Sequence, residues 1–212
     1  LGGNIFRVDN KTSIFTGTDQ QMKDVVAIMN YAEQSIQQNT YKKQINSLFG
    51  SASVGYMHTY YLEATLRGDK SSTLPISNNV YLYPSFSGSV VFSEFLKNKS
   101  IINYGKFRAS WAQVGSDTDP YQLALSYTTG KYSYGGYVIG MINNSTKPNK
   151  DLKPTRTNSF ELGMEMKFFQ GRLGLDVTYY NQLSKDQIIG LASSSTSGYN
   201  YRLVNAGEIQ NK

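Results

Sequence analysis

The chain contains no cysteine and only one histidine, His58, among its 212 residues. The absence of cysteine excludes disulfide bridges and thiolate metal sites. A catalytic triad or a histidine-rich metal site cannot be built from His58, which lies in a predicted turn and is interpreted as a surface residue. The sequence therefore predicts no cofactor and no metal, and it gives no support for an enzyme.

Long apolar runs and basic clusters are also missing. No segment approaches the 18 or more apolar residues of a membrane helix, so residence in a membrane would require a β-barrel. Charged residues make up 17% of the chain and the formal net charge is +6. This excess is either a solvated surface or an attraction for anionic lipid or substrate. No basic run is interleaved with stacking aromatic residues, so we expect no nucleic-acid partner.

The clearest pattern is an alternation of apolar and polar residues over residues 158–181. Its apolar positions are Phe160, Leu162, Met164, Met166 and Phe168, followed by Leu173, Leu175, Val177 and Tyr179. This period of two predicts a hairpin with one apolar face, and a turn centred on Gln170 and Gly171 would pair every apolar residue with an apolar partner. The same register places Glu165 opposite Asp176, which favours a hydrated polar face where Lys167 can relieve the repulsion.

The remaining strands follow the same pattern. We expect a second hairpin over residues 48–66, single strands over 83–92 and 105–115, a short helical connector over 93–99 and a last strand from Leu203. Residues 1–46 are polar and are predicted to form an extracellular loop region with a possible short helix within 18–31. Residues 47–212 are predicted to be transmembrane barrel strands with short periplasmic turns and long extracellular loops.

The connections alternate in length along the chain. They are short or modest at residues 57–59, 93–104 and 169–172, and long at 69–82, 116–157 and 182–201. Such asymmetry, with aromatic residues near strand ends, is typical of an outer-membrane barrel, and arms of about ten residues can cross a hydrocarbon core of about 30 Å. The predicted fold class is all-β, a partial transmembrane antiparallel β-barrel. A soluble or surface-attached β-sandwich that binds glycans is the alternative.

Four stretches in order carry a family resemblance: SLFGSASVGYMHTYYLEATLRGDKSS (47–72), YPSFSGSVVFSEFL (83–96), KFRASWAQVGS (106–116) and residues 149–212. Together they resemble the SusC/RagA family of TonB-dependent outer-membrane transporters. The chain departs from the family pattern at Gly68 and Lys70 around Asp69, and at Lys153-Pro154. The resemblance implies part of a 22-stranded barrel, and the plug domain and TonB-contacting segment are absent from this chain. A strand-like pattern still runs at the last residues, so we expect a fragment.

The resemblance also implies a function. The intact protein would lie in the bacterial outer membrane, in contact with lipid, and import a bulky nutrient such as an oligosaccharide or peptide. Its expected partners are a SusD-like surface lipoprotein and the TonB complex, which would act through the missing plug. Transport of this kind is binding and gating without covalent chemistry, so the protein is not expected to be an enzyme.

The candidate site residues fall in two groups. The predicted lumen-facing residues on the substrate path are Glu63, Arg67, Arg108, Glu161, Glu165 and Asp176. In the long connection Tyr132, Tyr134 and Tyr137 are candidates for contact with ligand or with a partner lid, or for plain loop packing. The carboxylates could also suggest glycoside hydrolysis, although a hydrated lumen is favoured. Asp117 and Asp119 could hold calcium, but a capped turn is favoured because the rest of a calcium loop is missing.

Overall fold

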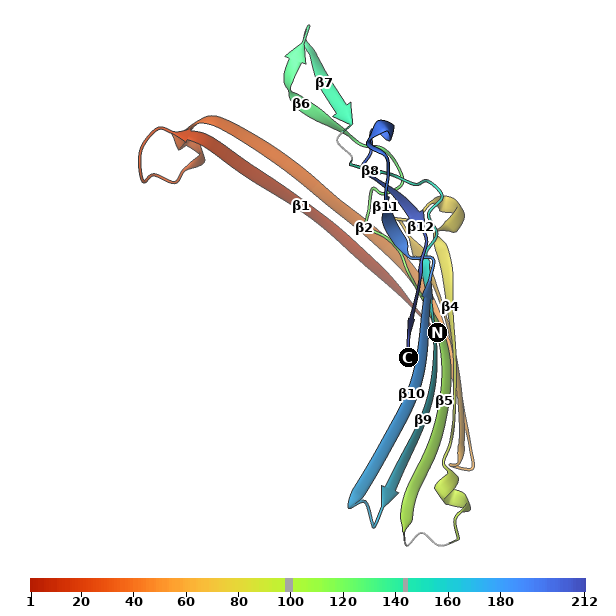
Figure 1. The fold of residues 1–212 in the computed structure, drawn as a ribbon. Helices are drawn as coiled ribbons and strands as arrows, with labels where there is room; N and C mark the ends of the chain where they lie inside the picture. The colour runs from red at the N-terminus through yellow and green to blue at the C-terminus, as the bar shows by residue number, and fades with distance from the viewer. Residues whose placement is uncertain (98–100, 143–144) are drawn as a thin grey trace.

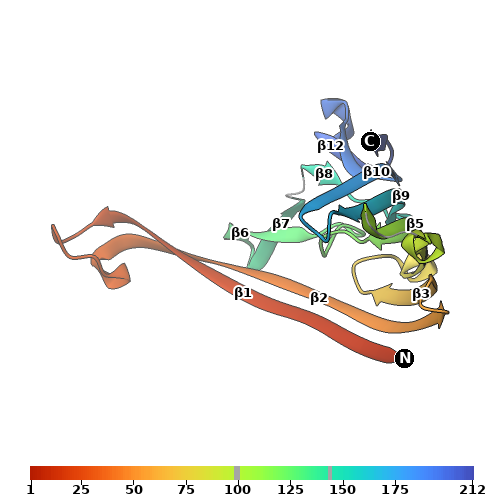
Figure 2. The same ribbon diagram turned by 90° about the horizontal axis from the view of Figure 1, so that it is seen from below.

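The computed structural model describes residues 1–97, 101–142 and 145–212, with only the backbone described at residues 128–133, 138, 141 and 142. Eight strands form one antiparallel sheet in the order β1-β2-β3-β4-β5-β9-β10-β13. Their bounds are β1 (Gly2–Gln20), β2 (Tyr31–Tyr56), β3 (Tyr60–Ser71), β4 (Val80–Val90), β5 (Ile102–Ser116), β9 (Thr155–Phe168), β10 (Leu173–Lys185) and β13 (Glu208–Asn211). The sheet is a single curved layer, and the view from below shows its strands along an open arc (Figure 2).

Smaller elements lie in the long connections. The strands β6 (Tyr127–Tyr134) and β7 (Tyr137–Ile142) form a separate hairpin, while β8 (Thr146–Lys147), β11 (Ile188–Ala192) and β12 (Tyr201–Asn205) form a three-stranded sheet. The 3-10 helices are η1 (Ile28–Asn30), η2 (Ile76–Asn78), η3 (Phe92–Phe95) and η4 (Ser195–Ser197). Within the described residues no helix has the length and apolar character needed to cross a membrane.

The two predicted hairpins are confirmed, and so is the register predicted for the β9–β10 pair. Phe168 lies opposite Leu173 and Glu165 lies opposite Asp176 in the β9–β10 pair, as the alternation requires. The four-residue turn has positive φ at Phe169 and Gln170 as well as at Gly171. In the β2–β3 hairpin Tyr56 pairs with Tyr60, and a tight turn of three residues joins the strands.

The pairing aligns side chains in rows across the sheet. One row on what we call the apolar face contains Val54, Leu62, Gly88, Ala109, Leu162 and Tyr179. The opposite face, which we call the polar face, carries the intervening residues. In the described part of the chain the only buried hydrophobic side chains are Leu74, Val91 and Leu152, and Leu62 is 67% exposed. No second layer covers the apolar face there, which disfavours the β-sandwich alternative.

The two ends of the sheet differ in part as predicted. The connections after β2, β4 and β9 lie at the lower end in Figure 1, and those after β3, β5 and β10 lie at the upper end. The two longest connections, residues 117–154 and 186–207, are upper ones, but the upper connection at residues 72–79 is shorter than the lower one at residues 91–101. The predicted connector after β4 is the 3-10 helix η3. The two longest connections therefore share the upper end of the sheet.

The prediction for residues 1–46 was wrong in its secondary structure. These residues form β1 and the first part of β2, which pair continuously from Gly2 opposite Phe49 to Thr18 opposite Glu33. The helix predicted within residues 18–31 is only the three-residue η1. Residues 116–157 and 182–201 also contain short strands that the predicted loops lacked. The sequence did not predict these strands because they lack the alternation of apolar and polar residues. They are held together by backbone pairing with the neighbouring strand. The extracellular location of residues 1–46 stays a prediction.

Candidate functional site

The polar face brings the predicted lumen-facing residues onto one surface but does not cluster them. Glu63 on β3 and Glu161 on β9 lie in one row, with Ser87 and Ser110 between them. Strands spaced by about 4.8 Å put these two carboxylates about 14 Å apart, well beyond the separation of a glycosidase pair. Both glutamates are exposed. The row offers spaced acceptors and hydroxyl groups to a polar ligand, and it lacks the geometry for hydrolysis.

Arg108 and Asp176 form an ion pair that spans β9. The guanidinium of Arg108 on β5 donates to both carboxylate oxygens of Asp176 on β10, at 3.2 and 2.9 Å, and to Thr178 Oγ1 at 2.7 Å. The side chain crosses the intervening strand over Gly163, where a methyl group would overlap the Arg108 Nε atom. Glycine at this position is therefore required by close approach of a side chain, not by the backbone conformation.

Glu165 is balanced separately. Lys167 Nζ lies 3.5 Å from Glu165 Oε1 and also 5.3 Å from the centre of the Tyr104 ring. The prediction that Lys167 relieves the opposed Glu165 and Asp176 carboxylates is thus confirmed for Glu165. Asp176 is neutralised by Arg108 instead, so the two acids can face each other across the ladder.

Arg67 is held in place by three contacts. Its Nε donates to Asp69 Oδ1 at 2.8 Å, a second nitrogen donates to Ser47 Oγ at 3.0 Å, and the guanidinium lies 5.9 Å from the centre of the Phe49 ring. The side chain of Asp69 is 9% exposed. Arg67 therefore balances charge at this position, and its side chain stays 44% exposed.

A compact polar cluster lies where β2 leaves the sheet. We define the Asp117 cluster as Lys43, Ser71, Thr73 and Asp117. Lys43 Nζ lies 2.7 Å from Asp117 Oδ1, while the hydroxyls of Ser71 and Thr73 donate to Asp117 Oδ2 at 2.5 and 3.1 Å. The Lys43 and Asp117 side chains are only 16% and 10% exposed. The ammonium group of Lys43 is thus the counter-charge of Asp117, and the described residues contain no group of three His, Cys, Asp or Glu side chains placed to hold a metal ion.

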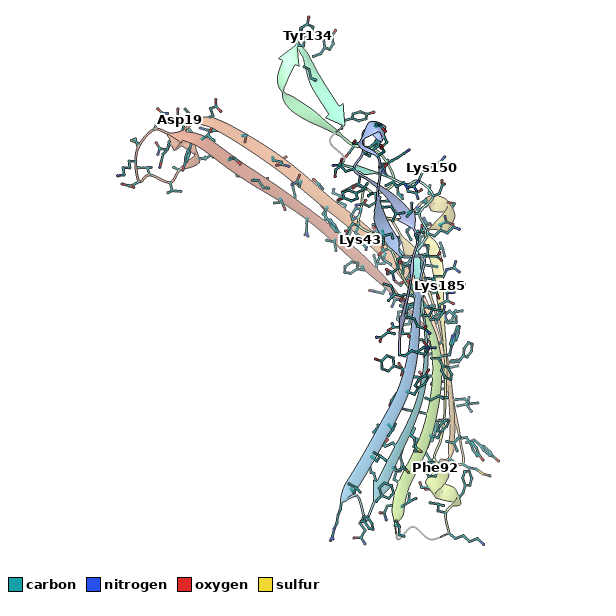
Figure 3. All side chains as sticks on the ribbon, in the orientation of Figure 1. Asp19, Lys43, Phe92, Tyr134, Lys150 and Lys185 are labelled. Carbon is teal, nitrogen blue, oxygen red and sulfur yellow. The ribbon has the colours of Figure 1, made fainter. Side chains whose placement is uncertain are left out.

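Residues that follow Asp117 form hydrogen bonds to the same stretch of β2. The Tyr121 hydroxyl accepts from the backbone N–H of Lys42 at 3.2 Å, and Tyr41 donates to Asp119 at 3.4 Å. β3 ends at Ser71, opposite Ile45, so β2 has no strand partner on that side beyond this point. We call residues 7–44 the ribbon. Figure 3 shows Lys43 at the base of the ribbon and Asp19 at its far end.

The predicted loop tyrosines lie at the tip of the β6–β7 hairpin. Tyr134 pairs with Tyr137 across Gly135 and Gly136, whose positive φ values of 59° and 81° suit a tight hairpin turn. The two tyrosines are 82% and 80% exposed. Figure 3 shows Tyr134 at the top of the molecule, away from the sheet. The side chain of Tyr132 lies outside the described residues.

Comparison with known proteins adds to this geometry. A family model described as "TonB dependent receptor-like, beta-barrel" matches residues 2–212. The chain belongs to the TonB-dependent receptor family. TonB-dependent receptor P26 of Formosa agariphila is 28% identical over 172 residues, covering 80% of this chain and 17% of that protein. SusC of Bacteroides thetaiotaomicron is 24% identical over 174 residues, covering 78% of this chain and 17% of that protein.

Solved structures show the same fold. The RagAB peptide transporter matches with a TM-score of 0.82 and 17% identity over 98% of this chain and 24% of the matched chain. The siderophore receptor PirA of Pseudomonas aeruginosa matches with a TM-score of 0.55 over 84% of this chain and 32% of its own. The resemblance to the SusC/RagA family is thereby confirmed, and the fold is an arc of a TonB-dependent receptor barrel. The chain spans about a sixth of the length of the curated relatives named above.

Two site features were missed by sequence reasoning. The ion pair between Lys43 and Asp117 joins residues 74 positions apart, and no local pattern relates them. Arg108 can cross over Gly163 only because β5 and β9 are paired in the sheet, although the long upper connection separates them in sequence. A glycine interrupting an otherwise polar strand face was the one available signal.

Proposed function

We propose that this chain forms part of the wall of an outer-membrane TonB-dependent importer, with the apolar face toward lipid and the polar face toward the substrate path. The observation that carries this proposal is the combination of an uncovered apolar face, an opposed face with charged residues and hydroxyls, and the two longest connections, residues 117–154 and 186–207, at the same end. In a barrel wall each of these features has a place: lipid outside, water inside, and loops at the outer surface.

The cargo would be a bulky nutrient, an oligosaccharide or a peptide, delivered together with a SusD-like surface lipoprotein. Relatives named SusC and the RagAB peptide transporter support this class of cargo and partner. Glu63 and Glu161 would offer acceptors along the path, while Arg67 and Arg108 would supply donors beside their own acidic partners. Glu165 and Asp176 would complete the charged lining. Import would require energy from the TonB complex and no bond-breaking step on the cargo.

The upper loops would meet the cargo or the lid first. Tyr134 and Tyr137, with Tyr132 beside them in sequence, present rings at the tip of a hairpin that contacts little else. A tyrosine ring can stack on a sugar or pack against a protein surface while its hydroxyl stays hydrated. This placement supports a role in capture rather than in passage through the wall.

Uptake in cells tests this proposal. The full-length receptor, tagged and expressed from its own locus, is expected in the outer-membrane fraction with heat-modifiable migration and with a co-purifying surface lipoprotein. Replacing Glu63 and Glu161 together by glutamine should slow uptake of the identified cargo, whereas the exposed loop variant Asp151→Asn should not. Recovery of the receptor in a soluble fraction, or uptake that does not depend on TonB, would contradict the proposal.

A further inference from the structure

The apolar face ends in positive charge at its upper boundary. Along β9 the apolar-face residues run from Phe168 up to Phe160 and finish at Arg156, and along β10 they run from Leu173 up to Lys185. Arg156 and Lys185 are direct cross-strand partners. At the lower ends of the same two strands, the apolar-face residues are Phe168 and Leu173, which are also direct cross-strand partners. Lys185 forms an ion pair with its other cross-strand partner, Glu208, at 3.4 Å, so Arg156 carries the net positive charge of these strands at the upper boundary, whereas the lower boundary is apolar.

An open cavity lies beside Arg156 at this boundary. β4 and β5 are paired from Val90 and Phe107 up to Ser85 and Ala112. The next residue of β4 is Pro84, which has no N–H to continue the ladder, and the two strand ends diverge. The resulting cavity has a volume of about 570 Å³, and its lining includes Asn78, Leu82, Pro84, Gln113, Lys153 and Arg156.

The cavity offers positive charge without a counter-charge. Among the residues that the structure describes, no acidic one lines it. Lys153 and Arg156 are both exposed and, among the described residues, neither lies in an ion pair. The backbone of Lys153 is fixed, since its N–H donates to Asn205 Oδ1 at 2.8 Å and its carbonyl accepts from Asn205 Nδ2 at 2.7 Å. The two cationic residues thus both line this cavity, and their exposed side chains are accessible to a ligand.

We propose that this cavity binds the phosphate-bearing head group of a membrane lipid at the outer surface of the barrel. Lys153 and Arg156 would hold the phosphate, with Gln113 and Asn78 as further donors. Leu82 lines the cavity, and the apolar-face residues directly below it are Phe86 and its cross-strand partner Trp111, where the acyl chains of the same lipid would begin. A lipid fits better than a free anion because the site is continuous with the apolar face. The inference rests on the proposed orientation of that face toward lipid.

The test measures binding of fluorescent bis-phosphorylated lipid A to the full-length receptor in neutral detergent. The variant Lys153→Gln/Arg156→Gln is compared with Lys147→Gln/Lys150→Gln, which removes the same charge from the neighbouring loop outside the cavity. We expect the cavity variant to raise the apparent Kd about tenfold or more, since each basic residue at a lipid surface contributes to binding. The control variant should leave the Kd unchanged, and heat-modifiable migration verifies that each variant is folded.

Other results would overturn the proposal. An unchanged Kd in the cavity variant, or an equal rise in both variants, would show that no specific head-group site exists. Inorganic phosphate that competes at the concentration of lipid A itself would assign the cavity to a free anion. Failure of the proposed membrane location is distinguished separately, because the receptor would then be absent from the outer-membrane fraction whatever its affinity for lipid A.

Discussion

The two halves of β2 have the same conformation for different reasons. Residues 45–56 pair with β3 on one side and show the alternation that exposes an apolar face on one side of the sheet. Residues 31–44 belong to the ribbon, pair with β1 alone, and are rich in glutamine and other polar residues. Alternation therefore marks a strand only where its two faces meet different environments. Where both faces meet water, the backbone ladder alone carries the structure.

This difference predicts different stabilities along one strand. A two-stranded ribbon is marginally stable in water, whereas a strand within a barrel wall has two ladders and a lipid-covered face. The base of the ribbon is strengthened by the Asp117 cluster and by the Tyr121 hydroxyl. We therefore expect the wall to tolerate little change on its apolar face, the base of the ribbon to tolerate an intermediate amount, and the ribbon itself to tolerate most substitutions.

The largest contrast should come from placing a charge on each region. Leu162→Arg puts a guanidinium in the middle row of the apolar face and should cost about 2–4 kcal/mol of unfolding free energy in a bilayer. Ile14→Arg puts the same group on the ribbon, where Ile14 is already 46% exposed, and should change stability by less than about 0.5 kcal/mol. Urea unfolding of the full-length receptor in vesicles measures both. Equal costs would show that the apolar face does not meet lipid.

A smaller effect is expected at the base of the ribbon. Asp117→Asn leaves Lys43 partly buried without its counter-charge and should lower the local opening free energy of residues 41–44 by about 2 kcal/mol. Amide hydrogen exchange of the full-length receptor measures this opening. Asp9→Asn is the matched control, because the Asp9–Lys42 pair at 3.4 Å is exposed and should contribute almost nothing. Similar exchange rates in the two variants would show that the Asp117 cluster does not stabilise the base of the ribbon.

The smallest effect concerns the ion pair on the polar face. Gly163→Ala would displace Arg108 from Asp176 and should cost at most about 1 kcal/mol, since both partners are about half exposed. Gly174→Ala, on the neighbouring strand, meets nothing within 4 Å and serves as the control. Urea unfolding of the two variants in the same vesicles compares them. A cost at Gly174 equal to that at Gly163 would indicate a general preference for glycine on this face.

The wall could be predicted from the sequence because its physics is local. In the β9–β10 hairpin the polarity of most residues indicates which face they occupy, and the register follows from pairing Phe168 with Leu173. The ribbon could not be predicted in this way, because a polar strand that is wet on both faces has the composition of a loop. The fold of residues 1–46 is set by the long pairing of β1 with β2. No turn motif in the sequence marks where this pairing starts or ends.

The candidate site was predictable only in part. The side of the sheet on which each side chain lies could be predicted residue by residue. The sequence therefore predicts Glu63, Arg108, Glu161 and Asp176 on one face. The partners of these residues could not be predicted. The topology of the whole sheet decides that β5 pairs with β9 and that Lys43 contacts Asp117. The spacing of the two glutamates across four strands is equally invisible to any local pattern.

The most direct test of the account is a scan of single spin labels along β9 in the full-length receptor in vesicles. The chain contains no cysteine, so each label position in this region is unique. Labels at Phe160, Leu162, Met164 and Met166 should be accessible to oxygen dissolved in lipid, while labels at Ser159, Glu161, Gly163 and Glu165 should be accessible to a water-soluble nickel chelate. Loss of this period of two, with the apolar positions shielded from both reagents by another protein layer, would contradict the central claim.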